Sequence, residues 1–230
     1  MYDLKEIVFL VIAAVVTSFF LSAVFPTLAL TSEFGVTFLL MLIIFFIFTA
    51  AQKLVAYGLD ADSKVKLMTF NQYGFRSNER MGFDFPVWLI LPLVLFFITA
   101  GKFVWTSILN FQPEALKTRV GRKFAELTEV DVAKIAMAGP LALLVFGLIM
   151  RAVGFNSYAT ICVLTAFLAL LPIGNGTKIF AGMRITSVFL MVLGLGILIL
   201  MHLTNVVSTI VIALIIAVAF IITYYALWEK

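Results

Sequence analysis

The polar residues that could do chemistry in this chain gather where one apolar run is interrupted. Pro172 is followed closely by Asn175, Gly176, Thr177 and Lys178. Proline removes a backbone donor and glycine adopts conformations that other residues resist, so the stretch predicts a broken helix. Broken backbone is stable at membrane depth only where protein or water satisfies it. An amide and a hydroxyl there could form half of a buried polar site, although a glycine-rich helix end explains the same residues.

Metal and thiol chemistry have few candidate residues. The chain has one histidine, His202, and one cysteine, Cys162, and each lies in or at the end of an apolar run. A single cysteine permits neither a disulfide nor a cysteine-rich metal site within one chain. A lone histidine at the end of an apolar run is more often an interface residue than a ligand.

The segments on either side of the break belong to a chain that is mostly apolar. Of 230 residues, 63% are hydrophobic and 12% are charged, a composition typical of multi-span membrane proteins. The net charge is +4, but the basic residues lie between apolar runs, where they indicate topology rather than nucleic-acid binding. We therefore expect a bilayer as surroundings, no nucleic-acid partner, and a single integral membrane domain over residues 1–230.

Six apolar runs are predicted to span the membrane, which needs about 20 helical residues for about 30 Å of hydrocarbon. Thr128 and Asp131 have the spacing of a capping box that begins the third span. The first run is too long for a signal peptide. The predicted spans are residues 7–30, 34–56, 132–150, 158–173, 185–203 and 206–228.

The apolar run at residues 86–109 is interpreted as re-entrant. Basic loops flank it on both sides, and a full crossing would put them on opposite faces, against the positive-inside rule. A segment that enters and leaves on one face keeps both loops and both termini in the cytoplasm. Lys102, near its middle, suits a segment shielded by protein or close to water.

One polar stretch predicts a strand. Residues 64–70 alternate polar and apolar side chains, with Val65 and Leu67 among the apolar ones. The expected fold class is an all-α polytopic membrane protein with about six transmembrane helices, one re-entrant segment and a small cytoplasm-facing β element.

Two further motifs give the break a partner. Ala138-Gly139-Pro140 lies on the third predicted span, about thirty residues before Leu171-Pro172, and Gln52-Lys53-Leu54-Val55-Ala56 ends the second. In this order the motifs resemble the site-2 protease family of intramembrane zinc metalloproteases. The resemblance covers about residues 45–184 and leaves residues 185–228 as a C-terminal helical hairpin. It implies an H-E-x-x-H zinc motif on the earlier span and a zinc-binding aspartate after the L-P motif.

This chain departs from the family at every catalytic position. Phe48, Thr49 and Gln52 stand where the resemblance places the first histidine, the glutamate and the second histidine, and Asn175 stands in place of the aspartate. Phenylalanine and glutamine cannot supply two imidazoles, and a neutral amide is a poor zinc ligand. No glutamate is placed to accept a proton from an attacking water. We therefore expect no zinc or other cofactor, and a pseudoprotease without catalytic residues.

The expected function is binding of membrane-embedded clients or partner subunits. Strand addition depends on backbone groups, so it could outlast loss of the metal; Val65 and Leu67 mark the candidate edge. The candidate groove is formed by Gly139, Pro140, Pro172, Gly176, Thr177 and Lys178.

Several alternatives stay open. One is a small transporter or channel component that uses the break at residues 172–177, and another is an active metalloprotease with atypical ligands. Residues 117–127 fit either a strand beside residues 65–70 or a basic amphipathic helix on the membrane surface. The expected location is a prokaryotic cytoplasmic membrane, with both termini in the cytoplasm.

Overall fold

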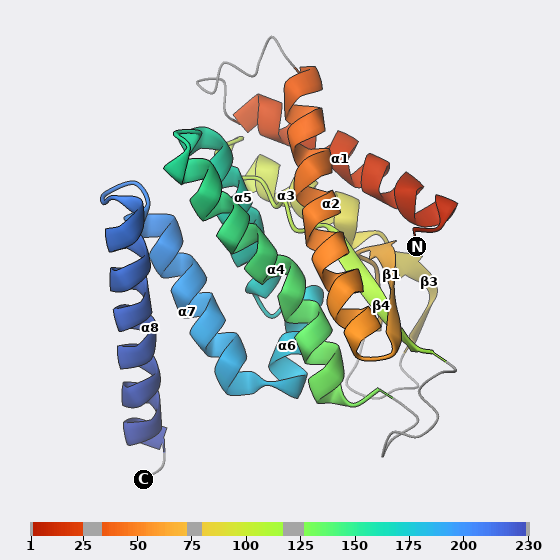
Figure 1. Cartoon of the computed structure of the whole chain (residues 1–230). Helices are drawn as coiled ribbons and strands as arrows, with labels where there is room; N and C mark the ends of the chain where they lie inside the picture. Colours follow the sequence, from red (N-terminus) through yellow and green to blue (C-terminus); the bar gives the residue numbers. More distant parts are fainter. Residues whose placement is uncertain (1, 25–33, 73–79, 117–126, 229–230) are drawn as a thin grey trace. The chain divides into compact units, whose positions relative to one another are not determined.

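The computed structural model describes residues 2–24, 34–72, 80–116 and 127–228, and Figure 1 shows the course of the chain. Helices predominate among these residues, and two small sheets accompany them. The elements are α1 (Leu4–Val24), α2 (Phe34–Gly58), β1 (Ala61–Leu67), β2 (Phe70–Gln72), β3 (Arg80–Phe85), α3 (Val87–Ile98), β4 (Leu109–Ala115), α4 (Glu129–Ala152), α5 (Asn156–Leu170), α6 (Asn175–Gly182), α7 (Arg184–Leu200) and α8 (Val206–Trp228).

Long apolar helices make the chain compatible with an integral membrane protein. By length and composition, α1, α2, α4 and α8 can each cross a membrane, and α5 with α6 can form a fifth, broken span. Helix α7 has only 17 residues. The count of about six spans stays a prediction.

The chain divides into two compact units that are interleaved in sequence. The first unit comprises Met1–Phe45 and Lys64–Gln112, and the second comprises Phe46–Ser63 and Pro113–Lys230. Each unit therefore draws on two separate stretches of sequence.

In the first unit, α3 occupies the segment predicted to be re-entrant. It has 12 residues, which at about 1.5 Å per residue is far short of the hydrocarbon thickness. Ala100 and Gly101 then adopt positive φ angles of 50° and 74° and turn the chain. Lys102 is exposed at this turn, and the chain returns without regular structure to β4. In the same unit α1 contacts α3, where the rings of Phe20 and Phe96 lie 5.4 Å apart.

The predicted strand is present, but the β structure is larger than expected. β1 begins at Ala61, earlier than residue 64, and ends at Leu67. It pairs with β4, while β2 pairs antiparallel with β3. Neither β4 nor the β2–β3 pair was predicted, because their partners are set by contacts between distant residues rather than by local alternation. Residues 117–126, for which strand and helix were both considered, lie outside the described residues.

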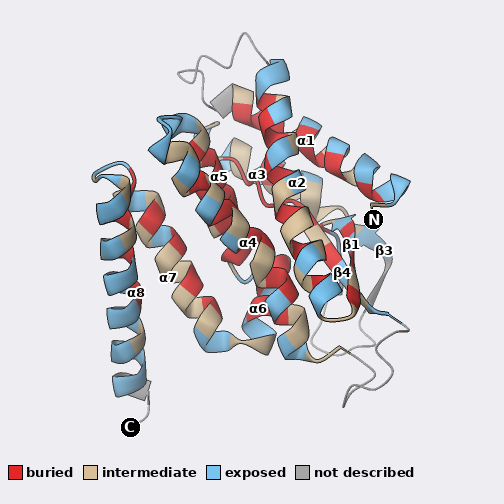
Figure 2. Ribbon diagram, in the orientation of Figure 1, coloured by how far each residue is buried: buried red, intermediate tan, exposed pale blue. Residues whose placement is uncertain are grey.

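The second unit contains α4 to α8. Helix α4 begins at the predicted capping box: Thr128 Oγ1 accepts a hydrogen bond from the Asp131 N–H at 3.2 Å, and Asp131 Oδ2 accepts from the Thr128 N–H at 3.4 Å. α4 contacts α5 and α6, while α7 contacts α5, α6 and α8. Much of the α8 surface is exposed, as Figure 2 shows.

The predicted helix break is also confirmed. Helix α5 ends at Leu170, three residues before the predicted end at Ile173, and α6 begins at Asn175 with a bend of 55°. Gly174 lies between them with φ 62° and ψ −110°. The predicted C-terminal hairpin is formed by α7 and α8. What the local pattern did not indicate is that a helix resumes directly at Asn175.

Candidate functional site

The positions aligned with the family's catalytic residues are all buried in the second unit. Phe48, Thr49 and Gln52 lie on α2 and are 4%, 1% and 1% exposed. Asn175 is the first residue of α6 and is 1% exposed. All four side chains are therefore almost inaccessible to solvent in the chain.

Phe48 packs directly on the small-residue turn of α4. A Cβ atom built on Gly139 would lie 2.7, 2.8 and 3.0 Å from three carbons of the Phe48 ring. Because real Cβ contacts are never so close, only glycine at this position lets the ring approach the α4 backbone. The structure thus brings together two parts of the predicted site, and an apolar ring lies where the resemblance expects a zinc ligand. Pro140 is buried next to Gly139.

Helix α6, which begins at Asn175, contacts α4, and Gly182 near its end is close to the Glu129 carbonyl at the start of α4. Gln52 follows Phe48 by about one turn of α2.

Several buried polar atoms of the second unit have no hydrogen-bond partner within the part of the chain that the structure describes. They are Asn175 Oδ1, Asn175 Nδ2, Gln52 Nε2 and Ser187 Oγ on α7. A buried polar group left unsatisfied costs about 1–3 kcal/mol, so these atoms favour a polar contact from outside the described residues. Amide groups can hydrogen-bond a peptide or a solute, but they supply neither a metal centre nor a base at neutral pH.

The remaining residues of the helix break differ in how far they are buried. Gly176 is buried, and a Cβ atom there would lie 1.7 Å from the Leu171 carbonyl oxygen. Pro172 and Thr177 are exposed, and the Thr177 hydroxyl donates a hydrogen bond to the Gly174 carbonyl at 2.6 Å. Lys178 is half-buried. Of the predicted groove residues, Gly139, Pro140 and Gly176 are thus buried, whereas Pro172 and Thr177 are exposed.

The strand predicted to bind a client has one edge paired with β4. The Leu116 N–H donates to the Asp60 carbonyl at 3.0 Å, and the Met68 N–H donates to the Ile108 carbonyl at 2.9 Å, so the two strands are antiparallel. Hydrogen-bonded pairs alternate along an antiparallel ladder. The N–H groups of even-numbered β1 residues therefore face β4, and those of Val65 and Leu67 face the opposite edge.

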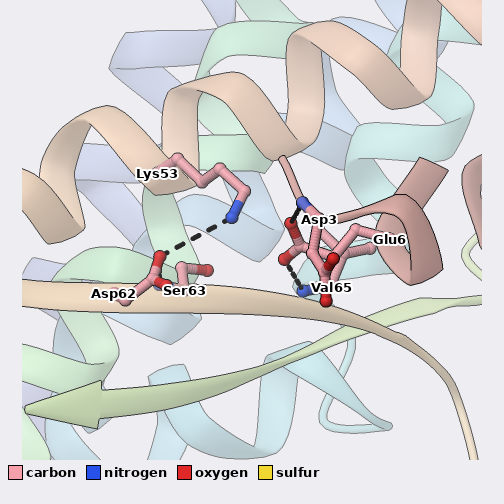
Figure 3. Close-up of polar contacts among 6 residues, drawn as sticks. All are labelled: Asp3, Glu6, Lys53, Asp62, Ser63 and Val65. Atoms are coloured by element: carbon pink, nitrogen blue, oxygen red, sulfur yellow. Dashed lines mark hydrogen bonds and ion pairs between the residues drawn. The ribbon is translucent and has the colours of Figure 1, made fainter. Parts of the chain in front are cut away.

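A carboxylate from α1 occupies that opposite edge. Glu6 Oε1 accepts a hydrogen bond from the Val65 N–H at 2.8 Å, and Glu6 Oε2 accepts from the Asp3 N–H at 2.8 Å (Figure 3). Glu6 is only 5% exposed. It closes the first turn of α1 and satisfies one N–H of the strand. Among the described residues, no strand pairs with this edge of β1.

Sequence reasoning missed the contact between Glu6 and β1. The available signal was its spacing from Asp3, since an acidic residue at the third helical position commonly caps its own helix. Nothing local could have indicated the bond to Val65, which joins residues 59 positions apart. Figure 3 also shows Lys53, from the predicted K-L-V-A motif, paired with Asp62 at 3.6 Å in the second unit.

One histidine bears on metal chemistry. His202 is exposed and borders a polar cavity of about 460 Å³ with Arg151 and Ser208. Within the described part of the chain, no three histidine, cysteine or carboxylate side chains are grouped to hold a metal ion.

Comparisons with known proteins do not assign a family. No protein-family model and no curated protein matches the sequence, and no solved structure matches the fold. The resemblance to the site-2 protease family therefore rests on the motifs alone.

Proposed function

We propose that this protein is a site-2-protease-like membrane protein without proteolytic activity, which binds membrane-embedded clients or partner subunits. The observation that carries the proposal is the outer edge of β1. One of its N–H groups is satisfied by a side chain rather than by a strand, so an extended segment of another chain can replace that contact.

The packing around α4 supports the absence of catalysis. The Phe48 ring fills the space against Gly139, and the other two aligned ligand positions carry neutral amides. A catalytic zinc needs three protein ligands and an open position for water, which these side chains do not provide. The buried amides of Gln52 and Asn175 instead suit hydrogen bonds to the backbone of a client segment.

Zinc content distinguishes this proposal from an active protease with atypical ligands. Protein purified without chelators is expected to contain far less than one zinc per chain, measured by elemental mass spectrometry. About one zinc per chain, lost in Asn175→Ala but kept in Thr177→Ala, would favour the protease instead.

Paired proline substitutions test strand addition. The Leu67 N–H faces the outer edge, so Leu67→Pro should weaken partner binding roughly two- to tenfold, as expected for loss of about one backbone hydrogen bond. Lys66→Pro should instead disturb the pairing with β4 and lower stability. Leu67→Ala, which keeps the N–H, is the matched control and should bind nearly as wild type.

The readout is the amount of each membrane protein that co-purifies with wild type, compared across the three variants by quantitative mass spectrometry. Circular dichroism identifies variants that remain folded. A folded Leu67→Pro protein that retains every partner at the wild-type level would show that clients do not bind at this edge of β1.

The broken helix is the observation that favours a second candidate, a small transporter or channel component. A 55° bend between α5 and α6 places the buried Asn175 at a helix interruption, where polar pathways can form. Solute or ion flux in proteoliposomes that Asn175→Leu abolishes would support this candidate over client binding.

A further inference from the structure

A groove in the second unit has a polar end and an apolar end. It has a volume of about 210 Å³ and is lined by Phe180, Arg184, Ile185, Val188, Ile221 and Tyr224. Helices α7 and α8 form an antiparallel hairpin, so Arg184 near the start of α7 and Tyr224 near the end of α8 lie at the same level. Val188 follows Arg184 by about one turn of α7, and Ile221 precedes Tyr224 by about one turn of α8. Because the helices are antiparallel, both residues lie about 5 Å from the polar end in the same direction.

The polar end of the groove carries one cation, Arg184. The Arg184 guanidinium lies 6.0 Å from the centroid of the Phe180 ring, within the range of a cation–π contact. Among the residues that the structure describes, no acidic side chain pairs with Arg184. The planar guanidinium can donate paired hydrogen bonds to phosphate oxygens.

The residues around the groove are of the types found where a membrane protein meets the lipid headgroups. Tyr224 and Tyr225 lie near the end of α8, and tyrosine is enriched where lipid headgroups meet the hydrocarbon. Only 17% of the most apolar window of α8 is buried inside the protein, so most of this helix can face lipid. With α8 across the bilayer, Arg184 would lie at headgroup level, and the groove would extend from there toward the hydrocarbon.

We propose that this groove binds one anionic phospholipid. Its phosphate binds Arg184, and the first methylene groups of one acyl chain lie between Val188 and Ile221. A neutral solute would leave the guanidinium unpaired, and a fully polar anion would leave the apolar end unfilled. The volume holds only part of a lipid, so the remaining chains stay in the bilayer. This site is independent of client binding at β1.

Lipid competition tests the proposal on the full chain. The protein is exchanged into equimolar phosphatidylglycerol and phosphatidylcholine, and retained lipids are counted by native mass spectrometry. Wild type should retain one phosphatidylglycerol with about tenfold preference, equivalent to about 1.4 kcal/mol. Arg184→Gln should abolish the preference, and Val188→Trp should reduce retention of both lipids by filling the groove.

Lys134→Gln is the matched control, because Lys134 is also an exposed cation of the second unit. It should keep the wild-type preference, and Arg184→Lys should keep most of it. No preference in wild type, an unchanged preference in Arg184→Gln, or an equal loss in Lys134→Gln would overturn the site. A photoreactive residue at position 188 should cross-link lipid; a cross-link to a second copy of the chain would assign the groove to subunit contact instead.

Discussion

Gly176→Ala is expected to lower the free energy of unfolding by about 3 kcal/mol or more, at or above the usual cost of overpacking. The added Cβ atom would lie 1.7 Å from the Leu171 carbonyl oxygen, 2.5 Å from the Leu171 carbonyl carbon and 2.8 Å from the Leu170 carbonyl oxygen. All three are backbone atoms, which cannot move aside by a change of rotamer. Relief of the clash requires a change in the bend between α5 and α6.

The measurement is unfolding of the detergent-purified protein by heat or denaturant, followed by circular dichroism. Gly58→Ala is the matched control, because no heavy atom lies within 4 Å of the Cβ position at Gly58. We expect this variant to be close to wild type in stability. If Gly176→Ala unfolds like Gly58→Ala, the backbone at Leu170 and Leu171 does not lie against Gly176.

Glu6→Ala is expected to lower stability while raising partner binding. The substitution leaves the N–H groups of Val65 and Asp3 without their acceptor, which costs about 1–3 kcal/mol for each group that stays buried. An extended client segment supplies a carbonyl to Val65 in place of the carboxylate. Because the client no longer competes with Glu6, the amount of partner that co-purifies with the protein should rise on the order of tenfold.

Glu6→Gln is the informative comparison, since its amide oxygen can still accept the Val65 hydrogen bond. Its stability and partner retention should both lie between those of wild type and Glu6→Ala. The two quantities are measured on the same preparations, by unfolding and by quantitative co-purification. A variant series in which retention falls together with stability would mean that Glu6 supports the fold and does not compete with a client.

The first of these predictions depends on a feature that the sequence indicates, and the second on one that it does not. The helix break follows from Pro172 and the neighbouring glycines, whose backbone preferences act within a few residues. The capping box at Thr128 and Asp131 is equally local, and it is present as predicted. The apolar runs likewise determine where the long helices lie, since about 20 consecutive apolar residues are long enough to form one membrane-spanning helix.

Tertiary structure alone decided how these elements form sites. The β1–β4 pairing and the bond from Val65 to Glu6 join residues far apart in the chain, and such partners leave no periodic signal in either segment. Gly139 could be recognised as small, but the ring that uses the space, Phe48, is determined by the packing of α2 on α4. Hydrophobicity and backbone preference are properties of a local stretch, whereas close packing and strand pairing depend on which distant stretch arrives beside it.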